Sequence, residues 1–215
     1  MKKIESEKIF CISFQRNGTR STGEVLRRLG YSVAGWTISN RNQWTEKLFD
    51  GNYEAIFADK DFLTNDAFED APWFCSNVYK YLFHKFSKSR FVLLERDSTS
   101  WMRSMRNHSN GKSLGKTDIH SEIYNRQLEL WNRLRAGENI AANNGLDLSD
   151  QDREYIRIYE THNLGVKLFF HKFAPERLSF ARLEDPNKWN KLADFLGCNC
   201  DDLSSIHENR SRHLG

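Results

Sequence analysis

Proline is scarce in this sequence, cysteine is sparse, and long apolar runs are missing. Three prolines and twelve glycines among 215 residues exclude a low-complexity chain. Four cysteines do not form a disulfide framework at this length, and Cys198 with Cys200 supplies only half of the ligands that a zinc site needs. No apolar run approaches the roughly 20 residues that cross a bilayer, and polar and charged residues occupy positions 5–8, where a signal sequence needs apolar ones. We therefore expect a soluble, cytoplasmic protein that contacts no membrane and holds no metal.

The charge balance is only mildly basic. Lys and Arg total 32 against 29 Asp and Glu, a net charge of +3, which falls short of the charge density typical of nucleic-acid-binding proteins. The six tryptophans are spread along amphipathic segments, so we interpret them as core residues and keep nucleic-acid binding as a weaker alternative. With 39% apolar residues the chain can bury a core of its own, and we predict a single domain over residues 1–215.

Hydrophobic patterning predicts strands that alternate with helices. Short apolar runs indicate strands at residues 8–14, 31–36, 53–58, 90–95 and 177–180. Helical spacing predicts helices at 19–29, 43–49, 73–86, 98–105, 120–137, 150–172 and 186–196, with Ser98 as a cap and with Gly30 and Gly197 as stops. The segments 60–72 and 107–118 are polar, and we expect surface loops there. The alternation implies an α/β fold with a mostly parallel sheet covered by helices on both faces.

Residues 14–22 combine the features of an anion-binding loop. They lie between the first predicted strand and helix, where the first helical N–H groups have no partners within the helix and the helix dipole is positive. Gly18 lets the backbone turn or approach a ligand closely. Arg16 and Arg20 supply charge there, beside the hydroxyl groups of the neighbouring residues Thr19, Ser21 and Thr22. The Walker A lysine is missing, which disfavours an NTPase or a kinase, and an ordinary strand–helix turn is the alternative.

A second candidate follows the strand predicted at 90–95. Arg96 stands at its carboxyl end, and Ser104 follows eight residues later, two turns into the next predicted helix. A guanidinium and a hydroxyl at this spacing can close on one phosphate group. Because parallel sheets bind ligands at the carboxyl ends of their strands, we expect Arg96 and the loop at 14–22 to share one edge. The alternative is a salt bridge from Arg96 to Glu95 or Asp97.

Together these regions resemble the sulfotransferase family. The family's phosphosulfate loop reads P-K-[ST]-G-T-[TS] after the first strand, and residues 15–21 (QRNGTRS) match it with glutamine for the proline, Arg16 for the lysine and Arg20 for a hydroxyl residue. The strand that ends in Arg96, followed by Ser104, is similar to the family's 3′-phosphate element. The resemblance covers most of the chain, including Asp70 before Pro72 and the closing helix that ends in F-L-G. It implies a three-layer sandwich like that of P-loop NTPases.

The resemblance also implies an activity and the residues that carry it. The activity is transfer of a sulfuryl group from 3′-phosphoadenosine 5′-phosphosulfate to a hydroxyl or amine, without a metal. Arg16 would contact the bridging oxygen and the leaving phosphate, and Arg96 and Ser104 would hold the 3′-phosphate. Asp70 would be the base, with Glu69 and Asp59 as competitors. The 5′-phosphosulfate would be cradled by a set of consecutive loop residues: Asn17, Gly18, Thr19, Arg20 and Ser21.

The substitutions in the loop keep a second function open. A chain with Gln15, Arg16 and Arg20 could bind the nucleotide, with or without its sulfuryl group, and catalyse nothing. If the chain is an enzyme, we expect a small-molecule or carbohydrate acceptor, in a pocket lined by residues 37–45, 60–72 and 107–118. Arg210 and Arg212 could fold over the nucleotide, although a solvated tail is an equal alternative. Neither the acceptor nor the oligomeric state follows from the sequence.

Overall fold

The computed structural model describes residues 7–140, 145–198 and 203, and the chain divides into two compact units. The first unit consists of Met1–Arg96 and Gly165–Gly215, and the second of Asp97–Leu164. The chain passes from one to the other after Arg96 and again within helix α10 (Asp152–Phe173). The single domain over residues 1–215 stays a prediction.

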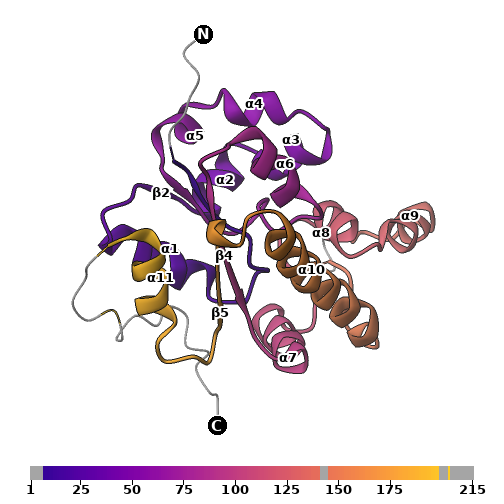
Figure 1. Ribbon diagram of the computed structural model, residues 1–215. Helices are drawn as coiled ribbons and strands as arrows, with labels where there is room; N and C mark the ends of the chain where they lie inside the picture. The colour runs from indigo at the N-terminus through magenta and orange to yellow at the C-terminus, as the bar shows by residue number, and fades with distance from the viewer. Residues whose placement is uncertain (1–6, 141–144, 199–202, 204–215) are drawn as a thin grey trace. The chain divides into compact units, whose positions relative to one another are not determined.

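The first unit is built on a five-stranded sheet (Figure 1). All its strands are parallel, in the order β2-β3-β1-β4-β5, so their carboxyl ends lie at one edge. This arrangement confirms the predicted α/β fold with a parallel sheet flanked by helices. The strands are β1 (Ile9–Cys11), β2 (Val33–Ala34), β3 (Ala67–Phe68), β4 (Arg90–Glu95) and β5 (Leu178–Arg182).

The two faces of this sheet carry different side chains, because successive strand residues point to opposite sides. On one face, Ile9 and Val92 join an aliphatic cluster with residues of α1 (Thr19–Arg28) and α11 (Lys188–Leu196), which lie on the same side of the sheet (Figure 1). On the other face, the ring of Phe10 lies 5.2 Å from that of Phe68 and 5.8 Å from that of Phe91, centroid to centroid. A helix layer on each face completes the predicted three-layer sandwich.

Several short helices complete the first unit. Helix α3 was predicted from the sequence, whereas hydrophobic patterning did not distinguish several of the others as separate helices. Their bounds are α2 (Trp36–Arg41), α3 (Trp44–Phe49), α4 (Tyr53–Phe57), α5 (Lys60–Thr64), α6 (Val78–Lys85) and the single 3₁₀ turn η1 (Pro175–Arg177). The predicted helix at 73–86 therefore begins only at Val78. The stops predicted at Gly30 and Gly197 are confirmed, with φ angles of 93° and 70°.

The strand predicted at residues 53–58 is wrong, because these residues form α4. The side chain of Asn52 accepts a hydrogen bond from the Ala55 N–H and so caps a helix. Tyr53 stacks on Tyr81 with ring centroids 4.6 Å apart, and Phe57 is buried. A short apolar run fits a buried strand and a buried helix equally well, and here the cap decides for the helix.

The loop predicted at 60–72 is also wrong in part, because it contains α5 and β3. Asp59 does not end a strand: its carboxylate accepts a hydrogen bond from the Asp61 N–H at 2.8 Å and caps α5. Strand β3 is only two residues long but lies between β2 and β1. Two residues are too few to show a period of two, so patterning missed a central strand.

The second unit contains α7 (Ser98–Ser109), α8 (Thr117–Ile123), α9 (Gln127–Arg135) and the first part of α10. Helix α7 is capped by Asp97, whose carboxylate accepts from the Ser100 N–H at 2.8 Å, and not by Ser98 as predicted. It takes up the first residues of the loop predicted at 107–118. The single helix predicted at 120–137 is broken into α8 and α9, where Asn125 has a φ of 56°.

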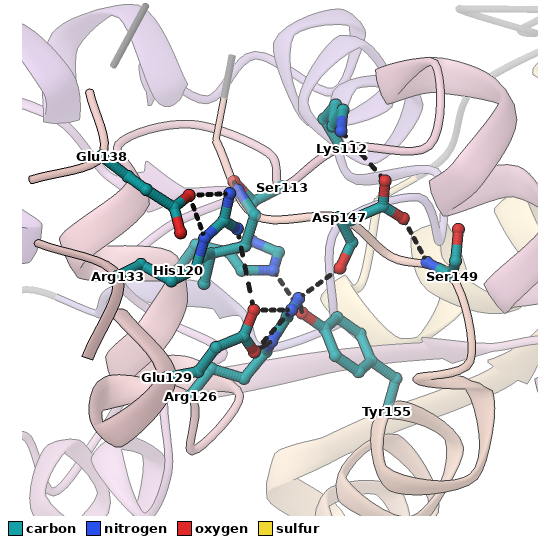
Figure 2. A network of polar contacts seen from close by, with 11 residues as sticks. Lys112, Ser113, His120, Arg126, Glu129, Arg133, Glu138, Asp147, Ser149 and Tyr155 are labelled. Carbon is teal, nitrogen blue, oxygen red and sulfur yellow. Dashed lines mark hydrogen bonds and ion pairs between the residues drawn. The ribbon is translucent and has the colours of Figure 1, made fainter. Parts of the chain in front are cut away.

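A buried histidine and tyrosine lie at the centre of a polar network in the second unit (Figure 2). The His120 Nδ1 accepts a hydrogen bond from the Leu114 N–H at 3.2 Å, so the neutral ring carries its proton on Nε2. That nitrogen lies 2.6 Å from the Tyr155 hydroxyl. Burial, followed by the charge of Arg126, lowers the pKa of His120 to about 3. The ring is therefore neutral at physiological pH.

Arg126 ties this centre to the surrounding loops. Its guanidinium donates to the Tyr155 hydroxyl at 3.1 Å, to the Asp147 carbonyl at 2.7 Å and to the Glu129 carboxylate at 2.8 Å (Figure 2). The Asp147 carboxylate in turn accepts from Lys112 at 2.9 Å. Side chains and loop backbone are thus joined in one network around the buried His120 and Tyr155.

No helix in the described part of the chain combines the length and the apolar character needed to cross a membrane.

Candidate functional site

The two candidate loops leave the sheet at neighbouring strand ends. Strands β1 and β4 pair in parallel with Cys11 opposite Val92. Beyond the strand, Ser13 still holds the β4 backbone, because its Oγ accepts from the Leu94 N–H at 2.7 Å. The loop that follows Phe14 and the residue that follows Glu95 therefore emerge side by side, as predicted from the alternation of strands and helices.

The loop itself turns tightly into α1. The Asn17 N–H donates to the Phe14 carbonyl at 3.2 Å, and Arg16 has a φ of 69°, an uncommon value for a residue other than glycine. Gly18 has a φ of 73° and stands at the N-cap of α1, where it offers no capping side chain. A Cβ at Gly18 would come within 2.9 Å of Leu183 Cδ1. Glycine is thus required here both by φ and by space, and the N-cap residue of α1 supplies no capping side chain.

The guanidinium groups of Arg16 and Arg96 act on one another at this edge. Both side chains are half-buried. Burial lowers the pKa of Arg16, the charge of Arg96 lowers it further, and Asp70 partly offsets the two. Arg96 also has a carboxylate within reach, since its Nε lies 3.9 Å from Glu184 Oε1. Two like charges held in a partly buried place, beside a helix N-terminus, form a site that favours an anion.

Asp70 belongs to the same edge, directly after β3 and its neighbour Glu69. Its Oδ1 accepts from the Ala71 N–H at 2.8 Å, and the Thr19 hydroxyl donates to its Oδ2 at 3.5 Å. Burial raises the pKa of Asp70, while these two hydrogen bonds and then the charges of Arg16 and Arg20 lower it. The structure thus brings Asp70 together with three of the predicted loop residues.

Glu69 points into the protein from the same strand end. Its side chain is 4% exposed, and its Oε2 has no hydrogen-bond partner among the described residues. Burial raises the pKa of Glu69 to about 7, and the charge of Asp70 also raises it. Arg27, the Thr19 hydroxyl and the Trp36 N–H lower it. Burial of a carboxyl group with an unpartnered oxygen favours the protonated form.

The remaining predicted residues are distributed as follows. Asn17, Thr19 and Ser21 are buried in the loop and first turn, whereas Arg20 is exposed. Ser104 lies in the second turn of α7, in the second unit, and its pairing with Arg96 stays a prediction. The glutamate and aspartate that flank Arg96 have other partners: Glu95 pairs with Lys167 at 2.8 Å, and Asp97 caps α7. Arg210 and Arg212 fall outside the described residues.

Patterning missed the residues that surround Glu69. A Cβ at Gly35 would collide with Glu69 Oε1, and one at Gly23 would lie 3.1 Å from Glu69 Cγ. A glycine inside a predicted helix, as at position 23, often marks such a close approach, so that signal was present. The signal at Gly35 was weaker, because it lies between a two-residue strand and a short helix. Over residues 7–140, 145–198 and 203, no group of three or more His, Cys, Asp or Glu side chains is placed to hold a metal ion.

The parallel sheet and the cationic loop between its central strand and the following helix define an α/β protein with a candidate anion-binding loop at the carboxyl end of a strand. A model of the sulfotransferase domain matches residues 8–214. The chain therefore belongs to the sulfotransferase domain family. No curated protein matches the sequence. Among solved structures, a gluconokinase from Sinorhizobium meliloti 1021 is similar over 80% of this chain and 99% of its own, with 12% sequence identity and a TM-score of 0.35, an overlap too low for a functional comparison.

Proposed function

We propose that this protein transfers a sulfuryl group from 3′-phosphoadenosine 5′-phosphosulfate to a hydroxyl or amine of a small-molecule or carbohydrate acceptor. The observation that carries the proposal is the placement of Arg16 and Arg96, within electrostatic reach of one another, at the carboxyl ends of the adjoining strands β1 and β4 and next to the N-terminus of α1. Two like charges close together attract an anion, and here Asp70 near Arg16 and Glu184 near Arg96 offset them only in part. A doubly phosphorylated adenosine has an anionic group for each arginine.

The residues present fit such a nucleotide. The co-substrate supplies the sulfuryl group and a phosphate as leaving group. Arg16 stabilises the charge that develops at the bridging oxygen, and the N–H groups of residues 17–21 with the Thr19 hydroxyl cradle the 5′-phosphosulfate. Arg20, which is exposed, adds positive charge at the outer side of the loop. Arg96, with Ser104, holds the 3′-phosphate. Arginine in place of lysine at position 16 keeps the charge and presents a planar fork to the anion.

Asp70 takes the proton that the acceptor group loses. It lies beside Thr19 and within electrostatic reach of Arg16, so it is placed near the anion-binding loop. Its raised pKa makes it a stronger base than an ordinary aspartate, which helps a general base that works near neutral pH. Asp59 is disfavoured, because its carboxylate caps α5 and also accepts from the Asn42 side chain at 3.4 Å.

The alternative is a protein that binds the nucleotide without catalysis, which the departures at Gln15, Arg16 and Arg20 favour. The two functions agree on binding and differ on turnover. Thermal unfolding with 3′-phosphoadenosine 5′-phosphate tests binding: at 100 times the dissociation constant it should add about 2.7 kcal/mol to the free energy of unfolding, and adenosine at the same concentration should add nothing. Sulfur-labelled co-substrate, offered with panels of hydroxyl, amine and carbohydrate acceptors, then tests transfer. Absence of stabilisation would contradict both functions, and binding without transfer to any acceptor favours the alternative.

A further inference from the structure

Glu69 is the one described carboxylate that the proposed reaction leaves without a role although it lies at the same strand end as Asp70. The fold provides a specific space for its side chain. The side chain passes between the backbones of Gly23 in α1 and Gly35 before α2, where a Cβ at either position would crowd or collide with it. A merely structural core position is more simply filled by an apolar side chain, because a buried carboxyl must be desolvated. The two glycines make room for a carboxyl group, so its chemistry requires an explanation.

The Thr19 hydroxyl is shared by the two carboxyl groups. It donates to Asp70 Oδ2 at 3.5 Å, and it is also a hydrogen-bond partner of Glu69. A hydroxyl has a single proton to donate, so it cannot satisfy two carboxylates at once. Because two neighbouring carboxylates repel one another, one of the pair is favoured to hold a proton.

The surroundings decide which carboxyl group that is. Burial raises the pKa of Asp70, but its carboxylate accepts from the Ala71 N–H at 2.8 Å and lies in the field of Arg16 and Arg20, and these three groups favour its charged form. Glu69 has an Oε2 without a partner in the described part of the chain. The described groups that face Glu69 come from the elements packed around it: Thr19 and Arg27 from α1, Cys11 from β1, the Trp36 N–H from α2 and Asp70 itself. Arg27 is the one cation among these groups, and it is half-exposed and also pairs with Glu24.

We infer that Glu69 is a positioning residue that holds its proton in mildly acidic solution, so that, of the two acids at this strand end, only Asp70 is presented as a carboxylate to the phosphosulfate loop and the Thr19 hydroxyl is kept for Asp70. This inference rests on the proposed function for its catalytic meaning. It assigns opposite protonation states to two adjacent acids: Asp70 is charged and takes the acceptor proton, and Glu69 is neutral and adds no negative charge beside the bound anion. Once Glu69 ionises, the anionic nucleotide meets a like charge and binds less tightly.

The first experiment detects the proton directly and needs no ligand. Infrared spectra of the wild type and of Glu69→Gln at pH 6 should differ by the carbonyl band of a protonated carboxyl group, present in the wild type and absent in the variant. The control variant Glu24→Gln, which changes a half-buried acid on α1, should keep the band. A wild-type spectrum in which Glu69→Gln removes only carboxylate bands would overturn the inference whatever the protein binds.

The second experiment measures binding of 3′-phosphoadenosine 5′-phosphate by calorimetry at pH 6 and pH 8. The ratio of the Glu69→Gln affinity to the wild-type affinity should rise about fivefold between these pH values, because one pKa unit of interaction with a new like charge corresponds to about tenfold only when pH lies well above the Glu69 pKa of about 7. Taking the ratio cancels the titration of the nucleotide itself. For Glu24→Gln the ratio should stay near one. A constant ratio for Glu69→Gln would overturn the positioning role.

The two experiments distinguish a failure of the proposed function from a failure of the inference about Glu69. If the wild type binds no nucleotide at either pH, the proposed function fails, while the infrared band still decides whether Glu69 is protonated. If the nucleotide binds but transfer is lost in Glu69→Gln and kept in Asp70→Asn, Glu69 is itself the base and the inference is wrong. Transfer kept in Glu69→Gln and lost in Asp70→Asn supports it.

Discussion

The guanidinium of Arg16 lies within electrostatic reach of that of Arg96, although the two residues follow different strands, β1 and β4. The relationship depends on sheet order, because β1 and β4 are direct neighbours and parallel. Each arginine thus stands where its strand ends, and the same geometry brings Asp70 to them from β3. The candidate site is a consequence of three strands that end at one edge.

Asp70→Asn should abolish transfer and spare nucleotide binding. Asparagine keeps the shape and the hydrogen bond from the Ala71 N–H but cannot take a proton, so we expect a loss of transfer of about 10²- to 10⁴-fold. Transfer is followed with sulfur-labelled co-substrate, and binding with calorimetry. Asp59→Asn is the matched control and should keep most of the activity, since Asp59 caps α5. Equal losses in both variants would remove Asp70 from the role of base.

Glu69→Gln should make the protein more stable relative to the wild type as pH rises. The pKa of Glu69 is about 7 in the folded protein against an ordinary value of 4.5. Below pH 4.5 the acid is protonated in both states and the variant gains nothing. Between pH 4.5 and 7 the unfolded chain ionises first, so wild-type stability falls, by up to about 3 kcal/mol once pH exceeds 7. Urea unfolding at pH 4, 6 and 8 measures the difference, and a difference that shrinks with pH would contradict the assignment.

Gly35→Ala should destabilise the protein through Glu69. The new Cβ would collide with Glu69 Oε1, and the backbone at Gly35 is extended, with a φ of −101°, so space is the cause and not φ. We expect a cost of about 1–3 kcal/mol. Glu69→Ala should remove most of that cost when the two substitutions are combined, giving a coupling of at least about 1 kcal/mol in a double-mutant cycle.

Gly165→Ala is the control for that cycle, because its Cβ would meet only the Tyr79 hydroxyl, at 3.4 Å. It should be neutral or stabilising, since alanine is the better helix former. Additive effects of Gly35→Ala and Glu69→Ala would show that the two residues do not touch in solution.

His120→Gln should reduce the acid sensitivity of the protein. The folded pKa of His120 is about 3, against an ordinary value of 6.5, so its contribution to stability is complete above pH 6.5 and is lost as pH falls from 6.5 toward 3. The variant loses hydrogen bonds and should be less stable at pH 7, by about 1–3 kcal/mol. Its deficit should shrink as pH falls to 4. His171→Gln, at an exposed position on α10, should show no such change. A deficit that is constant with pH would contradict the buried neutral ring.

Much of the first unit could be predicted from the sequence, because its strongest signals are local. The apolar run RFVLLE predicts strand β4, and the glycine at position 18 marks the turn that precedes α1. The parallel sheet then follows from alternation, and with it the shared edge of Arg16 and Arg96. Patterning failed where elements are too short to show a period, as in β3, and where one polar side chain decides between two structures, as Asn52 does for α4.

The protonation states at the site could not be predicted from the sequence. Glu69 and Asp70 are adjacent and chemically alike, and both were candidates for the base. What separates them is their surroundings in the fold: a backbone N–H and two arginines for Asp70, and two glycine backbones for Glu69. The same holds for His120, whose neutral state depends first on burial and then on the charge of Arg126.

The most direct test of the account is calorimetric binding of 3′-phosphoadenosine 5′-phosphate to the wild type, Arg16→Ala, Arg96→Ala and Arg28→Ala. Arg28 is the matched control, an arginine at the far end of α1 that pairs with Glu24. The account predicts that the wild type and Arg28→Ala bind alike and that each of the other variants binds at least about tenfold more weakly, as expected when a charge-assisted hydrogen bond worth about 1.5–3 kcal/mol is lost. Equal affinity in all four proteins, or no binding by the wild type, would contradict it.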